Sequence, residues 1–475
     1  MSSFGRDAER AKVARSVGRQ GRYDVEVSAP VKGPSFPAKS PSFYVETLGC
    51  PKNAVDSDKV VASLLADGLV PSSDPADADV VVVNTCAFIE AARQESIDVA
   101  LALADTKRAD AKLVITGCMA ERYGDELAAA LPEADAVIGF AQEGSIAEVV
   151  LKRKPVGVRD LLELPRPAPS APWAYVKVAE GCDRACAFCA IPSFRGPQRS
   201  RTIESIESEA RALVDAGVAE IVLVAQDLAW YGRDIGEPGS LAPLLRRLDA
   251  LAPHGLARIR LLYLYPSEVH DPLVSTMLEL PTVVPYFDLS LQHASAPLMR
   301  RMKRWGSGDR FLPMIEGIRA QQPDAVFRSS SIVGFPGETE TDHDRLLAFL
   351  ADARLDWAGF FAFSREDGTP AATMDGVVDE QLVRERLGEC AEIQDPITNA
   401  ARRALVGQTV EVLVDGIDED GGLVGRTHRE APEIDGVVRL AGDPLGGDVF
   451  ARPGAIVAAT VSGVMGPDLE AKPVP

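Results

Sequence analysis

The chain has 475 residues, of which 46% are hydrophobic and 25% are charged, and its formal net charge is -20. This length predicts two or three domains at roughly 100–200 residues each. The apolar runs fall short of the ~18 residues of a membrane span, and residues 1–40 lack the apolar core of a signal peptide, so a cytoplasmic protein without membrane contact is expected. So negative a chain gains no overall attraction to nucleic-acid phosphates, which favours a basic protein as its macromolecular partner.

Residues 1–40 contain eight Lys or Arg and four acidic residues, with little apolar periodicity and a proline-rich end. This composition predicts a disordered basic tail. Such a tail could touch RNA, but a solvated segment is the simpler interpretation.

Residues 41–155 repeat a strand, a loop and a helix three times, and each expected strand runs into a cysteine. The strands and their cysteines are 43–48 with Cys50, 80–83 with Cys86, and 113–116 with Cys118. Helices expected over 57–67 and 89–103 make the strands parallel, so their carboxyl ends share one edge of the sheet. We therefore expect the three thiols to converge and to hold an iron-sulfur cluster with an open iron. Three ordinary buried thiols are the alternative.

A proline-rich linker leads into a second predicted domain, residues 165–400. Six apolar strands alternate there with helices, and the strands are expected over 175–180, 220–225, 259–264, 286–291, 326–334 and 357–364. This alternation predicts a curved parallel sheet whose functional groups lie where strands end and loops begin. Cys390, in a helical stretch near the end of the domain, is expected to be a buried structural thiol.

Three cysteines, Cys182, Cys186 and Cys189, follow the first of these strands at C-x3-C-x2-C spacing. Iron-sulfur clusters normally take four cysteines, so this trio predicts a 4Fe-4S cluster with one iron open to an outside ligand. A zinc site or unrelated thiols are the alternatives, although zinc prefers paired C-x2-C units. The motif resembles that of the radical S-adenosylmethionine (SAM) enzymes, and the strand pattern resembles their partial (β/α)6 barrel.

That resemblance implies that SAM is contacted from three places: polar groups at the ends of strands, the residue between the last two cysteines, and one glycine turn. The candidates are Phe188, Gln226, Asp227, Gln292, Arg328, Gly334, Pro336, Gly337 and Glu338. A Gln or Asp can bond ribose hydroxyls or the methionyl amine, Arg328 can pair a carboxylate, and a glycine turn lets backbone approach an adenine. Each residue alone could equally be structural. Arg195 and Gly196 are expected to support the cysteine loop.

Residues 401–470 predict a small antiparallel barrel, with strands over 409–414, 422–426, 437–440 and 456–464. After a radical SAM domain, such a unit resembles the TRAM domain, usually a tRNA-binding module. Residues 401–475 contain seven Lys or Arg and twelve Asp or Glu. This negative balance argues against binding of a polyanion such as tRNA. We expect a Lys- and Arg-rich protein to be bound through Arg426, Glu430, Glu433 and Asp435, with a solvated loop as the alternative.

Residues 42–470 together resemble the methylthiotransferase family of radical SAM enzymes, which has these three domains in this order. Segments 48–57, 290–295 and 431–436 resemble the branch that methylthiolates an aspartate in the twelfth protein of the small ribosomal subunit. The tRNA-modifying branch typically carries a Gln-Ser-Gly type segment at 292–294 and a more basic TRAM domain. Asp183 stands where some members carry Asn, which removes no cysteine.

The resemblance implies a cytoplasmic enzyme with two 4Fe-4S clusters and two molecules of SAM. The cluster on Cys182, Cys186 and Cys189 would cleave SAM to a radical that takes a hydrogen from the aspartate β-carbon. The cluster on Cys50, Cys86 and Cys118 would hold the inserted sulfur, which a second SAM methylates. The implied partners are the ribosomal protein or assembled ribosome, a low-potential electron donor such as flavodoxin or ferredoxin, and a sulfur source; no disulfides are expected.

Two other functions stay open. The first is a tRNA adenosine methylthiotransferase, with the same chemistry on a nucleic acid. The second is a non-enzymatic iron-sulfur electron carrier or RNA-binding adaptor, which the open-site cysteine spacing disfavours, because a carrier would complete its clusters with four cysteines.

Overall fold

The computed structural model describes residues 40–152, 160–164, 166–418, 421–441 and 452–474. The chain divides into two compact units, and the N-terminal unit combines residues up to Ser170 with the separate segment Ala190–Gly196. The second unit holds Ala171–Cys189 and everything from Pro197 onward. The expected basic tail lies outside the described residues.

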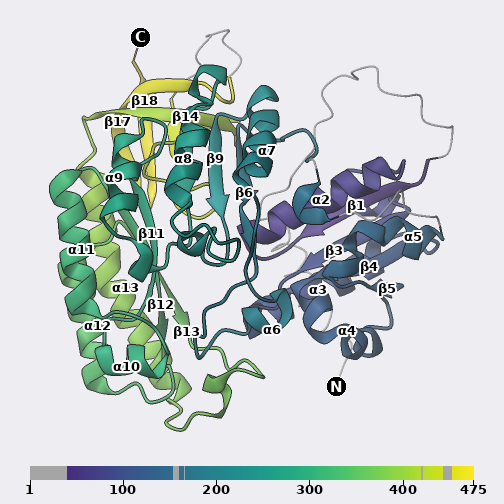
Figure 1. The fold of residues 1–475 in the computed structure, drawn as a ribbon, viewed down its shortest axis with the longest axis horizontal. Coiled ribbons are helices and arrows are strands. Elements are labelled where there is room, and N and C mark those ends of the chain that lie inside the picture. Colours follow the sequence, from purple (N-terminus) through teal and green to yellow (C-terminus); the bar gives the residue numbers. More distant parts are fainter. Residues whose placement is uncertain (1–39, 153–159, 165, 419–420, 442–451, 475) are drawn as a thin grey trace. The chain divides into compact units, whose positions relative to one another are not determined.

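The N-terminal unit is a parallel five-stranded sheet in the order β2-β1-β3-β4-β5, with helices between the strands (Figure 1). Its strands are β1(Ser42–Thr47), β2(Val70–Pro71), β3(Val80–Thr85), β4(Lys112–Gly117) and β5(Ala136–Val137). Its helices are α2(Pro51–Ala66), α3(Glu90–Thr106), α4(Cys118–Ala130), α5(Ile146–Leu151) and α6(Ile191–Arg195). The doubly covered sheet explains why β3 reads as an unbroken valine run: Val81 and Val83 pack on one face, and Val80 and Val82 on the other.

The second unit begins with two three-stranded parallel sheets, β6-β9-β10 and β11-β12-β13. Parallel bridges from Ile259 to Val283 and from Leu264 to Leu289 join them into one curved sheet of six strands. The strands are β6(Trp173–Lys177), β9(Glu220–Val224), β10(Arg258–Leu261), β11(Tyr286–Gln292), β12(Val326–Val333) and β13(Trp357–Ala362). A short hairpin, β7(Ala179–Glu180) with β8(Arg199–Ser200), flanks the cysteine motif.

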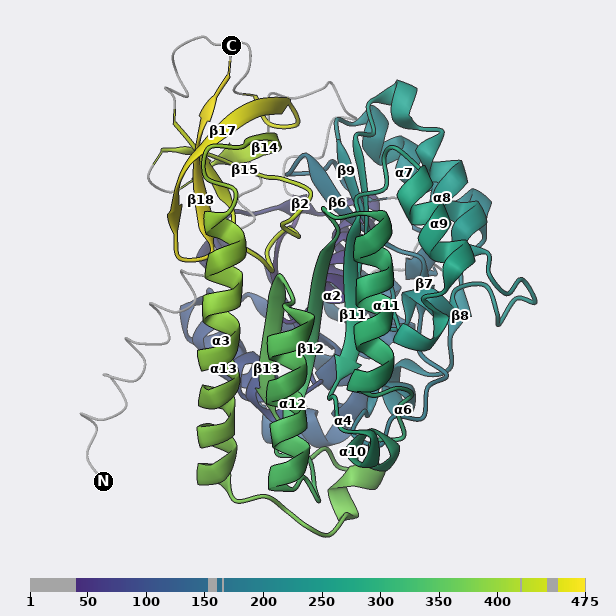
Figure 2. The same cartoon turned by 90° about the vertical axis from the view of Figure 1, so that its left-hand side faces the viewer.

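Helices cover the outer face of this curved sheet, and α11, α12 and α13 lie side by side along it (Figure 2). The helices are α7(Ile203–Asp215), α8(Leu241–Asp249), α9(Asp271–Glu279), α10(Ala296–Arg301), α11(Gly308–Gln321), α12(Glu340–Ala353) and α13(Glu380–Arg403). Apolar residues of strands and helices form one continuous core that includes Cys390, which is fully buried in α13. The domain boundary expected at residues 400–401 falls inside α13.

The C-terminal strands close into a five-stranded barrel in the order β14-β15-β16-β18-β17. They are β14(Thr409–Ile417), β15(Leu423–Arg426), β16(Val438–Leu440), β17(Ile456–Met465) and β18(Asp468–Pro473). Neighbouring strands are antiparallel except β16 and β18, which run parallel. The sequence prediction missed β18, whose only two buried residues, Leu469 and Ala471, are too few to stand out as a strand.

The three predicted architectures, a parallel α/β domain, a partial (β/α)6 barrel and a small β-barrel, are thus confirmed. All seven cysteines are free thiols. Within the described part of the chain, every helix is too short or too polar to cross a membrane.

Candidate functional site

The structure brings Cys50, Cys86 and Cys118 together at the carboxyl edge of the N-terminal sheet. Cys50 precedes α2, Cys86 follows β3, and Cys118 begins α4. Cys86 lies close enough to Cys50 and Cys118 for their charges to affect its ionisation. Burial, and to a smaller extent these two charges, raises the pKa of Cys86 to about 12. This is the convergence that the parallel strand order predicts.

Two glycines allow the cysteine-bearing loops to approach so closely. Gly49 has φ +97°, and a Cβ there would lie 3.0 Å from the Cys86 sulfur and 2.8 Å from its Cβ. Gly117 has φ +86°, and a Cβ there would lie 2.2 Å from Oδ1 of Asn84. Only glycine fits both the left-handed backbone and the contact.

Buried polar side chains fix the loops around the thiols. The Asn53 amide donates to the carbonyls of Leu48, at 2.9 Å, and Thr85, at 3.0 Å, and so ties the ends of β1 and β3 together. The backbone N–H of Cys86 donates to the Ser96 hydroxyl at 3.1 Å. These residues were missed at the sequence level, although Asn53 stands within the segment that carries the family resemblance.

The positive charges around this trio favour the thiolate form of Cys50, and thiolates are the ligands of iron-sulfur clusters. Burial opposes ionisation of Cys50, but the positive charges of Lys52 and Arg195 and two backbone N–H groups outweigh it and lower the pKa of the thiol. Among the described residues, no three His, Cys, Asp or Glu side chains already surround a single-ion site. The three thiols of a cubane need not surround a single ion, because each thiolate binds a different iron.

The second trio, Cys182, Cys186 and Cys189, lies in the loop between β7 and β8 of the second unit. Main-chain bonds fasten the loop: the N–H of Ala187 donates to Met302 O at 2.9 Å, and the N–H of Ala371 donates to Ala187 O at 2.8 Å. Burial raises the pKa of Cys182 to about 11, and nearby Asp227 and Cys186 add to that shift. Phe188 packs at the edge of the main core.

Two arginines that the sequence prediction missed hold this loop. The Arg184 guanidinium stacks on Trp230 and Tyr265, 4.0 and 3.9 Å from their ring centroids, and bonds the Asp227 carboxylate at 2.6 Å. Arg304 donates to the Cys186 sulfur at 3.3 Å. Arg184 could have been noticed because it stands inside the cysteine motif, whereas nothing in one sequence marks Arg304.

Two acceptors at the end of β9 lack a partner within the described chain. Gln226 donates to Glu180 at 2.7 Å, but its own Oε1 is buried and unbonded. Oδ1 of Asp227, a residue that is 3% exposed, is likewise unbonded. A buried acceptor without a donor is costly, so these atoms fit a ligand that carries hydroxyl or ammonium groups.

Glu338 fixes the backbone of the glycine turn at 334–337. The Glu338 carboxylate accepts the N–H groups of Gly334, at 2.6 Å, and Phe335, at 3.2 Å, and it is paired with Arg386 at 3.0 Å. Its side chain is fully buried, so the structure gives it a positioning role in place of the expected cofactor contact. Arg301 bonds the carbonyl of Pro336 at 2.7 Å.

Of the other SAM candidates, Arg328 is already occupied inside the protein. It donates to Asp288 at 2.9 Å and lies 3.5 Å from the carboxylate of Asp435, so it does not offer a free guanidinium as expected. Gln292 ends β11 with φ +73°, next to a register shift between β11 and β12. Such strained backbone concentrates at functional sites.

The expected substrate-binding segment, residues 426–436, requires correction. Three of its four candidate side chains are buried: Arg426 and Asp435 are 2% exposed, and Glu430 is fully buried. Arg426 bonds Glu220 at 2.8 Å, and Glu430 pairs with Arg402. Only Glu433, of these four, is exposed. Charge counting could not foresee this, because it does not distinguish solvated carboxylates from buried ones.

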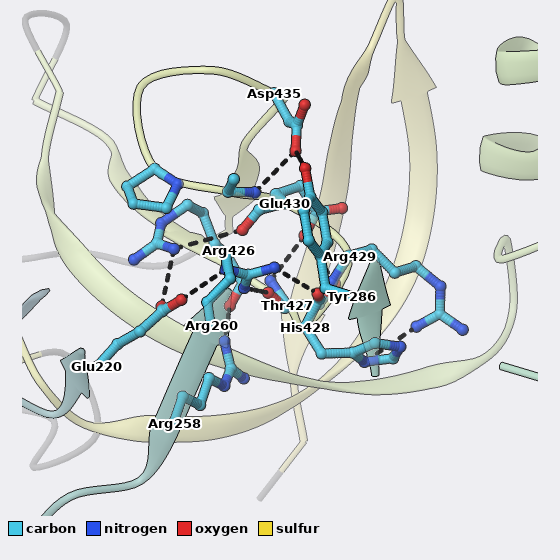
Figure 3. A network of polar contacts seen from close by, with 12 residues as sticks. Glu220, Arg258, Arg260, Tyr286, Arg426, Thr427, His428, Arg429, Glu430 and Asp435 are labelled. Atoms are coloured by element: carbon cyan, nitrogen blue, oxygen red, sulfur yellow. Dashed lines mark hydrogen bonds and ion pairs between the residues drawn. The ribbon is translucent and has the colours of Figure 1, made fainter. Parts of the chain in front are cut away.

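This segment, which we call the plug, contacts the amino-terminal ends of all six strands of the curved sheet, and Figure 3 shows its contacts with residues of β9, β10 and β11. One residue or two from each strand take part: Tyr175 bonds Pro432 O, Glu220 bonds Arg426, Arg258 bonds Arg426 O, Arg260 bonds His428 O, Tyr286 and Arg328 meet Asp435, and Trp357 bonds Arg429 O. The cysteine motif follows the opposite, carboxyl end of β6. The plug therefore closes the end where barrel enzymes do not place their sites.

Comparison with known proteins agrees with this architecture. Residues 42–139 match the uncharacterized protein family UPF0004, residues 176–350 match the radical SAM superfamily, and residues 406–474 match the TRAM domain. The fold is similar to that of a radical SAM methyltransferase, TsrM from Kitasatospora setae, at a TM-score of 0.51 and 14% identity, over 70% of this chain and 77% of that one.

These domains define a radical SAM enzyme that uses an iron-sulfur cluster and SAM. The chain is 40% identical to the ribosomal protein uS12 methylthiotransferase RimO of Kineococcus radiotolerans, over 93% of this chain and 99% of the relative. It is 44% identical to RimO of Moorella thermoacetica, over 84% and 93% of the two chains. The chain belongs to the RimO family of radical SAM methylthiotransferases.

Proposed function

We propose that the protein adds a methylthio group to the β-carbon of an aspartate in ribosomal protein uS12, with two 4Fe-4S clusters and two molecules of SAM. The observation that supports it most is the second cysteine trio, Cys50, Cys86 and Cys118, which offers three thiols for a second cluster besides the one that would bind SAM. The names of the relatives support the substrate, and the ribosomal substrate in turn supports a cytoplasmic location. A low-potential electron donor and a sulfur source are part of this proposal.

Cys182, Cys186 and Cys189 would hold the cluster that binds SAM, and Cys50, Cys86 and Cys118 the one that carries sulfur. When bound, these groups supply a radical able to remove a hydrogen from carbon and the sulfur that replaces it. Gln226 and Asp227 would accept hydrogen bonds from SAM through their unbonded oxygens. Arg184 holds Asp227 in place, and Glu338 fixes the turn at Gly334.

For the protein substrate, the placement of the side chains supports a narrower proposal than the sequence did. Glu433 is exposed on the plug and can meet a basic partner, whereas Arg426, Glu430 and Asp435 act inside the protein. Substrate would enter at the carboxyl ends of the curved sheet, where Gln292 lies.

The test is a single-turnover assay of the reconstituted protein under anaerobic conditions, with purified uS12, assembled small subunits and tRNA as separate substrates. Intact mass should show a methylthio gain on uS12, free or in the subunit, and none on tRNA. Cys50→Ala should abolish the gain while SAM is still cleaved. Cys390→Ala, which removes a buried thiol outside both trios, should retain both reactions. A gain on tRNA with uS12 unchanged would refute the proposal.

A further inference from the structure

The segment Ala190–Gly196 follows Cys189 directly in sequence, yet it belongs to the N-terminal unit. Ala190, just before helix α6, and Phe194 within the helix are both buried in the core there, and α6 packs beside α4. The helix ends at Arg195, six residues after the last cysteine of the SAM motif, and its side chain is 2% exposed.

Arg195 brings its guanidinium to the N-terminal thiols. One terminal nitrogen, Nη2, lies 3.0 Å from the Cys118 sulfur, 2.8 Å from Oδ1 of Asn53 and 3.2 Å from the carboxylate of Asp56. The guanidinium carbon lies 4.6 Å from the ring centroid of Phe140. A buried cation held by an amide, a carboxylate and a ring has a fixed position, which a long surface arginine lacks.

A charge-assisted hydrogen bond to a cysteine ligand favours the more negative, reduced state of an iron-sulfur cluster, because hydrogen bonds to the sulfurs and local charge set its potential. We propose that Arg195 is a positioning residue that bonds the Cys118 thiolate and raises the reduction potential of the N-terminal cluster. This inference rests on the proposed cluster at Cys50, Cys86 and Cys118. One short segment thus ends the SAM motif and supplies a cation to the other cysteine site.

The experiment uses the full-length chain with Cys182, Cys186 and Cys189 all changed to Ala, so that only the N-terminal cluster forms. In this background Arg195 is retained or changed by Arg195→Gln or Arg195→Lys. The control, Arg108→Gln, removes the same charge from an exposed arginine that pairs with Asp79 and Asp110. Iron and sulfide are measured per chain, and the midpoint potential is measured by a redox titration followed by electron paramagnetic resonance.

Arg195→Gln should lower the equilibrium constant for one-electron reduction about tenfold, a shift of about 59 mV to more negative potential. The midpoint potential of Arg195→Lys should lie between those of Arg195→Gln and the parent, and the midpoint potential of Arg108→Gln should equal that of the parent. Equal potentials in Arg195→Gln and Arg108→Gln would overturn the inference. If Arg195→Gln takes up no iron, recovery of the cluster by Arg195→Lys supports the role of the cation, and failure of both contradicts it. A parent that holds no iron would refute the proposed cluster itself.

Discussion

At the scale of single residues, Asp435 shows how the protein uses a buried acid. Its carboxylate accepts a hydrogen bond from the Tyr286 hydroxyl at 2.6 Å and from the N–H of Ala431 at 2.9 Å. Burial raises the pKa of Asp435 to about 6, although Arg328 and the Tyr286 hydrogen bond oppose that rise. The folded state therefore holds this proton more tightly than the unfolded chain does.

This raised pKa predicts a particular pH dependence of stability. The contribution of Asp435 is fully present below its unfolded pKa, about 4, and is lost as the pH rises through about 6, by an amount on the order of 3 kcal/mol. Asp435→Asn removes this titration. The melting temperature of the wild type, relative to that of the variant, should fall between pH 4.5 and 6.5, as measured by thermal denaturation. A difference that does not change with pH would contradict this account.

At the scale of elements, the N-terminal site depends on how a strand ends. Strand β4 finishes in Gly117, whose left-handed backbone turns the chain directly into α4 and places Cys118 at its first position. The same Gly-Cys order follows β1 at Gly49 and Cys50, two residues beyond the end of that strand. The turn geometry, more than the helix or the strand, sets where the thiols lie.

Gly117→Ala should therefore damage the site more than an ordinary glycine substitution. The new Cβ would lie 2.2 Å from Asn84 Oδ1 and 2.6 Å from Thr85 O, so the loop would have to move. Gly68→Ala is the matched control, because Gly68 has φ +83° but open space around it, and it should cost about 1 kcal/mol from backbone strain alone. Gly117→Ala should lose more stability and take up less iron on reconstitution. Equal iron and equal melting temperatures in the two variants would disprove the role of the contact.

Much of this element-level organisation could be predicted from the sequence, and there are physical reasons why the rest could not. The βαβ period placed Cys50, Cys86 and Cys118 on one edge because parallel strands leave no other arrangement. Arg195 could not be assigned to them, since no local pattern shows that seven residues of the SAM motif's loop join the other unit. The acids of the plug were misjudged because burial depends on partners such as Arg402, far away in sequence.

At the scale of the whole molecule, the plug makes the curved sheet and the C-terminal barrel one body. Arg426 bonds Glu220 of β9 at 2.8 Å and Asp415 of β14 at 2.7 Å. The positive charges of Arg260 and Arg426 outweigh burial and lower the pKa of Glu220 to about 2. Its carboxylate is therefore ionised, and this contribution to stability is present above about pH 4.5 and lost as the pH falls through about 2.

We expect the curved sheet and the barrel to unfold together. Hydrogen exchange should give amides of β9 and β17 the same opening free energy. Arg426→Met should lower both by about 3–5 kcal/mol, since it takes the arginine from the carboxylate of Asp415 and leaves buried Glu220 with Arg260 alone. Arg439→Met, at an arginine on the same barrel that is 38% exposed and paired with Asp418, should change them by less than about 1 kcal/mol. A variant in which only the barrel amides exchange faster would show two independent bodies.

The way the plug is held also bears on how its sequence can change over evolution. Tyr175, Arg258, Arg260 and Trp357 donate to main-chain carbonyls of residues 426–432. A carbonyl is common to every amino acid, so these bonds survive substitution of the residue that supplies it. Substitution of His428 or Arg429 should therefore keep the main-chain bonds and lose only the side-chain pairs with Asp324, whereas a change of the donor side chains, or of Arg426 or Glu430, removes a buried bond outright. The exposed side chains of the plug can therefore change while most of its attachment stays intact.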